Sequence, residues 1–276
     1  MTYREARNLI ISSLKNAGIE EAEQESLILL EYVTGMDRTA YLLYEEQEIS
    51  ETRQIRLISS ASLRTSHCPL QYITGRQEFY GLSFQVNTDV LIPRPETELL
   101  VERVLALSEP GDEVLDLGTG SGCIAVAVAH ERPDVSVTAA DVSRFALDTA
   151  RQNAKQNKCS VEFIESDLFD QVDGSFDRIV SNPPYIRRDE IDTLMPEVSK
   201  YEPKIALDGG EDGLAFYRLI IEEAPAYLKP GGTLAFEIGH DQADDVTHML
   251  QEQGFTEIAV TQDYNNLDRV ITASHP

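Results

Sequence analysis

Cysteine is scarce in this chain. Cys68, Cys123 and Cys159 are spread over 276 positions and show no Cys-x-x-Cys spacing. An odd, scattered set of this kind argues against a disulfide framework and against a zinc site. We therefore expect no disulfides and no bound metal, and we expect Cys123, which lies in an apolar helical run, to be a small core residue.

Long apolar runs are also missing. No stretch approaches the roughly 20 apolar residues of a membrane-spanning helix. The N-terminal residues 1–7 lead into an amphipathic pattern and not into the apolar core of a signal peptide. Because 42% of the residues are hydrophobic and 26% are charged, the composition is that of a soluble globular protein. We expect a cytoplasmic monomer with no membrane partner.

Basic residues are outnumbered. The chain has 23 Lys and Arg against 48 Asp and Glu, which gives a net charge of −25. Proteins that bind DNA or RNA normally carry a basic stripe, since phosphate contacts dominate their affinity. The acidity therefore disfavours direct nucleic-acid binding and suits a small molecule or a basic protein partner. Solubility alone accounts for most of these charges.

The first quarter of the chain predicts a small helical bundle. Thr2 and Glu5 form a capping box at the start of the first helix. In the last helix we expect Ile55, Ile58, Ala61 and Leu63 to be buried. The helices are expected over residues 2–18, 20–34, 38–44 and 50–65. Nothing in this segment indicates chemistry.

A change of pattern follows the bundle. Residues 77–86 combine aromatic and β-branched residues around Gly81, which is typical of a β-hairpin. Two prolines, Pro93 and Pro95, then stiffen the chain before a helix. We expect three parts: a helical bundle over residues 1–75, a hairpin linker over 76–92 and a larger domain over 93–276.

Beyond residue 112 the chain alternates between strands and helices. The apolar strands predict a doubly wound, mostly parallel seven-stranded sheet of the α/β class, with helices on both faces. Its strands are expected at residues 113–117, 136–140, 161–165, 176–180, 233–238, 258–262 and 270–273.

A glycine loop follows the first of these strands. It consists of Gly118, Thr119, Gly120, Ser121 and Gly122. Glycines permit tight turns and close approach of a ligand, and ligands of such sheets bind at this first turn. The spacing is not the Gly-x-Gly-x-x-Gly of dinucleotide-binding proteins, and a glycine loop alone is weak support for a site.

Two carboxylates sharpen the prediction. Asp141 ends the second strand, where it can accept hydrogen bonds from a ribose diol, and Asp167 closes the third, within reach of an adenine amine. Either residue alone is as easily a helix cap or a turn residue. Together with the glycine loop they describe a nucleoside ligand without a phosphate requirement, which S-adenosylmethionine fits.

The fourth strand runs into a stiff segment, Asn182-Pro183-Pro184-Tyr185. Each proline lacks an N–H and restricts the residue before it, so the segment is rich in carbonyls and poor in donors. An –NH2 group can be held between the Asn182 side-chain oxygen and the Pro183 carbonyl. Asn-Pro and Pro-Pro are also common turn dipeptides.

The glycine loop and the Asn-Pro-Pro-Tyr segment together resemble a Rossmann-like class I methyltransferase that acts on a planar, conjugated nitrogen. Further motifs resemble the peptide chain release factor glutamine N5-methyltransferase (PrmC/HemK) family, over essentially the whole chain. These motifs lie at residues 69–75, 78–81, 91–98 and 263–269. Leu168 varies from the family, because some relatives carry a bulky aromatic residue there.

The resemblance implies methyl transfer from S-adenosylmethionine to the glutamine of a Gly-Gly-Gln motif in class 1 translation release factors, with S-adenosylhomocysteine as product. It also implies that the helical bundle over residues 1–75 docks the release factor, and it implies site residues. Residues 118–122 would wrap the cofactor, Asp141 would bind its ribose, and Asp167 and Leu168 would flank its adenine. Asn182 would contact both cofactor and substrate, and Pro183, Pro184 and Tyr185 would hold the glutamine.

Two other functions fit part of the pattern. Adenine-N6 DNA methyltransferases and guanine-N2 RNA methyltransferases also use Asn/Asp-Pro-Pro-Tyr/Phe, but the chain shows no basic face. A scaffold that only binds S-adenosylmethionine is disfavoured, because such a protein does not need the acceptor geometry of residues 182–185.

Overall fold

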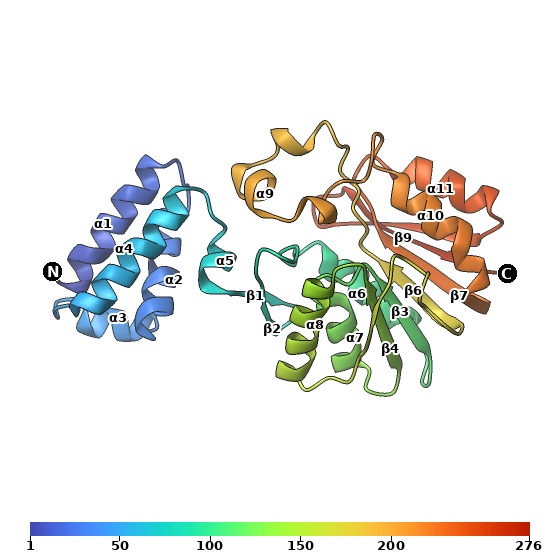
Figure 1. The fold of residues 1–276 in the computed structure, drawn as a ribbon, viewed down its shortest axis with the longest axis horizontal. Helices are drawn as coiled ribbons and strands as arrows, with labels where there is room; N and C mark the ends of the chain where they lie inside the picture. The colour runs from blue at the N-terminus through green and yellow to red at the C-terminus, as the bar shows by residue number, and fades with distance from the viewer. The chain divides into compact units, whose positions relative to one another are not determined.

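The computed structural model describes all 276 residues, and they form two compact units (Figure 1). Residues 1–75 and 195–201 form what we call the helical unit. Residues 76–194 and 202–276 form the sheet unit. The hairpin after residue 75 thus belongs to the sheet unit, and a short piece from late in the sequence belongs to the helical unit. None of the helices combines the length and the apolar composition that a membrane-spanning segment needs.

The helical unit is a bundle around one apolar core. Thr2 caps the first helix through the expected capping box, in which its backbone N–H donates to Glu5 and its hydroxyl accepts from the Glu5 N–H. The core includes Ile10, Leu14 and Leu57. The helices are α1 (Tyr3–Asn16), α2 (Ala22–Thr34), α3 (Arg38–Tyr44), α4 (Glu51–Thr65), α5 (Leu70–Thr74) and α9 (Pro196–Tyr201).

One prediction for α4 is wrong. Ile55, Ile58 and Leu63 were expected inside but are 58%, 44% and 53% exposed. Ala61 is buried as expected, and the other buried residues of α4 are Leu57, Ser60 and Arg64. Their spacing is a regular helical stripe, which the apolar pattern concealed because it includes an arginine. Arg64 can be buried there because two carboxylates, from Glu25 and Glu197, pair with it.

The sheet unit contains the predicted seven-stranded sheet. Its order is β5-β4-β3-β6-β7-β9-β8, and only β9 runs antiparallel to its neighbours. The strands are β3 (Glu113–Leu117), β4 (Ser136–Asp141), β5 (Glu162–Glu165), β6 (Phe176–Ser181), β7 (Leu228–Glu237), β8 (Thr256–Gln262) and β9 (Asp268–Ser274). A separate hairpin pairs β1 (Arg76–Phe79) with β2 (Leu82–Gln85).

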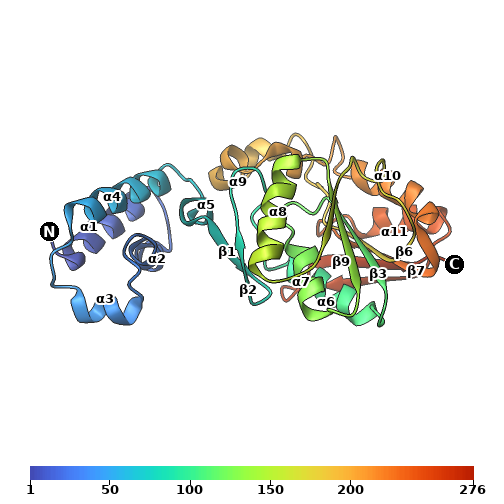
Figure 2. The ribbon, with the colours of Figure 1, turned by 60° about the horizontal axis from the view of Figure 1, so that its bottom comes forward.

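Helices cover both faces of this sheet, which confirms the doubly wound fold (Figures 1 and 2). On one face lie α6 (Thr97–Leu107), α7 (Cys123–Glu131) and α8 (Arg144–Gln156), and on the other lie α10 (Ala215–Glu223) and α11 (Ala243–Glu252). Short 3-10 helices complete the unit at η1 (Ile191–Thr193), η2 (Lys204–Ala206) and η3 (Ala224–Ala226).

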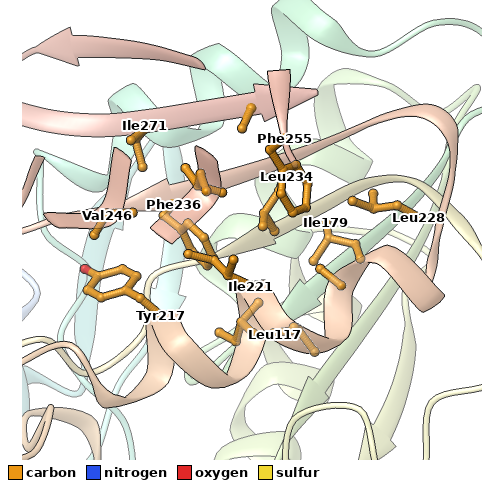
Figure 3. Close-up of a cluster of buried hydrophobic side chains, with 14 of the residues drawn as sticks. Leu117, Ile179, Tyr217, Ile221, Leu228, Leu234, Phe236, Val246, Phe255 and Ile271 are labelled. Carbon is orange, nitrogen blue, oxygen red and sulfur yellow. The ribbon is translucent and has the colours of Figure 1, made fainter. Parts of the chain in front are cut away.

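Strand periodicity explains the two cores. Successive side chains alternate between faces, so Ile179 packs with α10 and α11 while Val180 packs with α6 and α7. Figure 3 shows the first of these clusters, in which Tyr217 of α10 meets Phe236 of β7 edge to face at a centroid distance of 5.3 Å. Rigid packing on both faces fixes the strand ends, from which the polar loops emerge.

Candidate active site

Four neighbouring strands end at the same edge of the sheet. Leu117 of β3 is paired with Ala140 of β4 and with Ser181 of β6, and Ser181 is paired with Phe236 of β7. The loops that follow these strands therefore start side by side. This edge is where doubly wound sheets bind their ligands, and it gathers most of the polar residues that the sequence singled out.

The glycine loop turns directly from β3 into α7. Gly118, Gly120 and Gly122 all have positive φ, at 70°, 55° and 81°. A Cβ on Gly118 or Gly120 would meet open space, whereas one on Gly122 would lie 2.9 Å from the Ala150 Cβ. Gly122 is thus required for packing against α8, and the first two glycines leave the loop open to a ligand.

Asp116 lies beneath this loop and is fully buried. Its Oδ2 accepts from the Thr119 hydroxyl at 2.6 Å and from the Ala125 N–H at 3.2 Å. Its Oδ1 has no partner. Burial raises the pKa of Asp116 to about 7. No sequence pattern assigned a role to Asp116, yet its Oδ1 is an unused acceptor next to the glycine loop.

Asp141 is the last residue of β4, as predicted. Its Oδ1 accepts from the Ser143 N–H and its Oδ2 from the Gly120 N–H, both at 2.8 Å. Burial raises its pKa. Each carboxylate oxygen has two acceptor positions, so Asp141 holds the glycine loop in place and still has lone pairs for a hydroxyl donor.

Asp167 lies two residues beyond the end of β5, at Glu165, and does not close the strand as expected. Its side chain is exposed, and Leu168 beside it is half-buried. Leu168 has a φ of 46°, a conformation that is uncommon outside glycine. The Ser166 hydroxyl donates to the Leu168 carbonyl at 2.9 Å, and the Ser166 N–H donates to the Asp141 carbonyl at 3.0 Å. These bonds hold the loop after β5 against the end of β4.

The Asn182–Tyr185 segment begins at the end of β6. The Ser181 hydroxyl donates to the Leu117 carbonyl at 2.7 Å, so the segment starts beside the glycine loop. The Tyr185 carbonyl accepts from Gln242 Nε2 at 3.0 Å. The following residue, Ile186, exchanges backbone hydrogen bonds with Leu207 and Gly209. Backbone and side-chain bonds thus fix both ends of the segment.

Two glycines press against the same segment. A Cβ on Gly209 would lie 2.8 Å from the Pro184 carbonyl oxygen, and a Cβ on Gly213 would lie 2.5 Å from the Tyr185 carbonyl oxygen. Real Cβ atoms do not approach backbone this closely without displacing it. The loop 209–213 therefore fits the Pro184–Tyr185 backbone only because it lacks side chains there.

The proline-rich segment before α6 is held by long-range contacts. Arg94 Nη2 donates to both carboxylate oxygens of Glu202 at 2.6 Å, and Glu98 accepts from the Tyr80 N–H at 2.7 Å. The sequence identified this segment only as a family motif. In the structure it connects the hairpin, the start of α6 and the chain that follows α9.

A buried pair behind Asn182 escaped the sequence analysis. The Thr97 hydroxyl donates to Glu237 Oε2 at 2.6 Å, and both residues are buried. Asn182 Nδ2 donates to Thr97 Oγ1 at 3.3 Å, and the Tyr185 hydroxyl donates to Glu237 Oε1 at 3.2 Å. Burial raises the pKa values of Glu237 and Tyr185. The sequence does hold one signal for Glu237. It is a carboxylate at the end of the apolar strand β7, at the edge of the sheet where ligands bind.

The arrangement joins a loop open to a ligand with a segment rich in acceptors. No group of three or more His, Cys, Asp and Glu side chains is arranged to hold a metal ion. The acceptors near residue 182 suit a donor group such as –NH2. Such a site can orient a nitrogen and stabilise positive charge on it.

Comparison with known proteins gives close relatives over the full length. Family models described as methyltransferase small domain and PrmC N-terminal domain match residues 95–198 and 5–75. A release factor glutamine methyltransferase from Geobacter sulfurreducens is 42% identical over 271 residues, which cover 98% of this chain and 95% of the relative. Another, from Fusobacterium nucleatum, is 43% identical over 272 residues, which cover 96% of this chain and 77% of the relative. A solved methyltransferase from Pyrococcus furiosus shares the fold, with a TM-score of 0.54 at 19% identity over 82% of this chain and 98% of that chain.

Proposed function

Because this chain belongs to the release factor glutamine methyltransferase family, we propose that it methylates the Gly-Gly-Gln glutamine of class 1 translation release factors. The methyl group passes from S-adenosylmethionine to the side-chain amide nitrogen, and S-adenosylhomocysteine is released. The observation that supports this most is the pairing of Leu117 with Ser181. It starts the glycine loop and the Asn182–Tyr185 segment from adjacent positions, as a methyl transfer between their ligands requires.

The residues at the strand ends suit the cofactor. Gly118 and Gly120 leave open space for it, Asp141 retains acceptor positions for the ribose hydroxyls, and the free Asp116 Oδ1 is an acceptor for an ammonium group. The proposed cofactor residues are Gly118, Thr119, Gly120, Ser121, Gly122, Asp141, Asp167, Leu168 and Asn182. When bound, S-adenosylmethionine supplies a methyl group that its sulfonium sulfur already activates, so the protein needs no metal and no nucleophilic side chain.

The protein's part in the reaction is to position an amide that is a poor nucleophile. The Asn182 side-chain oxygen and the Pro183 carbonyl accept the two amide hydrogens, which orients the nitrogen and favours the positive charge that builds on it. Pro183 and Pro184 add no competing N–H. Tyr185 offers an aromatic face to the planar amide. We assign no general base.

The helical unit is proposed to dock the release factor. Its helix α4 exposes Ile55, Ile58 and Leu63, and exposed apolar side chains grouped on one element suit protein contact. The net charge of −25 complements the basic surface expected of a partner that also contacts RNA. Since translation factors act in the cytoplasm, we place the reaction there, with the enzyme as a monomer.

Methyl transfer to purified substrates tests the function. The enzyme and tritium-labelled S-adenosylmethionine are incubated in three parallel reactions, with release factor, with DNA and with RNA. We expect label on the release factor alone, and its loss when alanine replaces the glutamine of Gly-Gly-Gln. Label on DNA or RNA and none on the release factor would establish the alternative, an amino methyltransferase acting on adenine N6 or guanine N2.

A further inference from the structure

Three polar side chains, one of them from the Asn182–Tyr185 segment, form a hydrogen-bonded chain. Asn182 Nδ2 lies 3.3 Å from Thr97 Oγ1, and Thr97 Oγ1 lies 2.6 Å from Glu237 Oε2. The three residues come from the loop after β6, the start of α6 and the end of β7. Thr97 and Glu237 are 2% and 1% exposed, so solvent does not compete for their protons.

The direction of these bonds follows from the donors available. An ionised carboxylate only accepts, so the single hydroxyl proton of Thr97 must point at Glu237. The Thr97 oxygen can then only accept from Asn182. Of the two ends of the Asn182 amide, the –NH2 end alone can donate. The amide oxygen is thereby directed away from Thr97.

Several neighbours of Glu237 stabilise the ionised form on which this direction depends, although the pKa of the buried carboxyl is raised on balance. Burial raises the pKa of Glu237 and Glu96 adds to this, but the Thr97 hydroxyl, the positive charge of Arg269 and the Tyr185 hydroxyl oppose it. The short contact from Thr97 is what a hydroxyl bonded to a carboxylate anion gives.

We propose that Thr97 and Glu237 are positioning residues that set which end of the Asn182 amide faces the substrate. The two ends of an asparagine amide have nearly the same shape, so packing does not distinguish them and hydrogen bonds do. Thr97 and Glu237 keep the nitrogen toward α6 and leave the oxygen to accept from the glutamine amide. This inference rests on the proposed function, in which that oxygen binds the substrate.

Substitution at Thr97 is the first test. Thr97→Val keeps the shape and removes the hydroxyl, and Thr97→Ser keeps the hydroxyl. We expect Thr97→Val to lower kcat on the release factor about 3- to 10-fold, the worth of one net hydrogen bond, with S-adenosylmethionine affinity unchanged. Thr97→Ser should restore kcat. Thr149→Val, which removes another buried hydroxyl that accepts from Asn87, controls for a general loss of stability and should keep kcat.

A double-mutant cycle separates orientation from simple support of the fold. Asn182→Ala should lower kcat on the order of 10²- to 10³-fold. If Thr97 acts through the Asn182 amide, Thr97→Val should cost nothing further in the Asn182→Ala background. An equal loss of kcat in both backgrounds would overturn the inference.

Two further controls keep the test decisive. Should Thr97→Val not fold, because the buried Glu237 Oε2 loses the hydroxyl that donates to it, the cycle is repeated in a Glu237→Gln background, where the same two outcomes apply. Failure of the proposed function is seen separately, as wild-type enzyme that leaves the release factor unlabelled. Additive losses in an enzyme that does label it overturn the positioning role alone.

Discussion

Arg64 Nη1 lies 2.9 Å from Glu197 Oε1, in an ion pair between residues 133 positions apart. The same guanidinium donates from Nε to Glu25 at 2.7 Å, and only 9% of the Arg64 side chain is exposed. Burial alone would raise the pKa of Glu197, but Arg64 and His67 hold it below its usual range. This pair anchors α9 within the helical unit.

Arg64→Ala should release α9 from its place. Removing one partner of a partly buried charged network leaves the carboxylates of Glu25 and Glu197 without their cation, at a cost of about 1–3 kcal/mol. We expect faster amide hydrogen exchange over residues 195–201, measured by mass spectrometry, and a lower Tm. Arg56→Ala, on an exposed position of the same helix, should change neither, and equal exchange in both variants would contradict the assignment.

Gly213→Ala should distort the Asn182–Tyr185 segment. Gly213 and Gly231 have nearly the same φ, 77° and 76°, but only a Cβ on Gly213 would meet the Tyr185 carbonyl. Both substitutions carry the cost of a left-handed alanine, about 1 kcal/mol. Only Gly213→Ala should also reduce methyl transfer, measured as kcat on the release factor. Similar activities of the two variants would show that contact with Tyr185 is unimportant.

The strand ends were the most predictable part of the site. Apolar residues mark the strands, and the carboxyl ends of parallel strands meet at one edge, so Asp141 and Asn182 were placed correctly at the ends of β4 and β6. Asp167 was expected to close β5, but that strand ends two residues earlier, at Glu165.

Contacts between distant residues were not predictable. Thr97 and Glu237 are 140 positions apart, and neither has a local pattern that selects the other. The prediction of the buried face of α4 was wrong for a related reason. Hydrophobicity ranks Ile55 above Arg64, but the carboxylates that make burial of Arg64 favourable come from other helices.

Asp116 should make stability depend on pH. Its carboxyl has a pKa of about 7 in the folded protein against about 3.9 when unfolded. Between these values the folded chain holds a proton that the unfolded chain has released, so the stabilisation is full below the lower value and is lost as pH rises to the upper one. The free energy of unfolding of the wild type, relative to Asp116→Asn, should be larger at about pH 5 than at about pH 8.

Denaturant unfolding at both pH values provides the measurement. Asp134 is a suitable control, because the hydrogen bond from Arg132 holds its pKa below the usual range. Asp134→Asn should therefore differ from the wild type by the same amount at both pH values. If the free energies of unfolding of the wild type and of Asp116→Asn differ by the same amount at both pH values, Asp116 is ionised in the folded protein over this range.

The apolar face of α4 should matter for docking and not for chemistry. Ile55→Ser with Ile58→Ser removes two exposed apolar side chains, so stability should change little. We expect the KM for the intact release factor to rise about tenfold, from the lost burial of apolar area, while kcat on a short Gly-Gly-Gln peptide is unchanged. Leu219→Ser, at an exposed position of α10, is the matched control. An unaltered KM would exclude this face from the docking surface.

The composition of the helical unit has a consequence for exchanging parts between relatives. Its residues come from 1–75 and from 195–201, so a cut after Gly75 does not separate the whole unit from the rest of the chain. A chimera that takes residues 1–75 from another family member would inherit a foreign partner for Glu197. Compatible chimeras should therefore carry the 195–201 piece along with the first 75 residues, and substitutions in the two stretches should be inherited together.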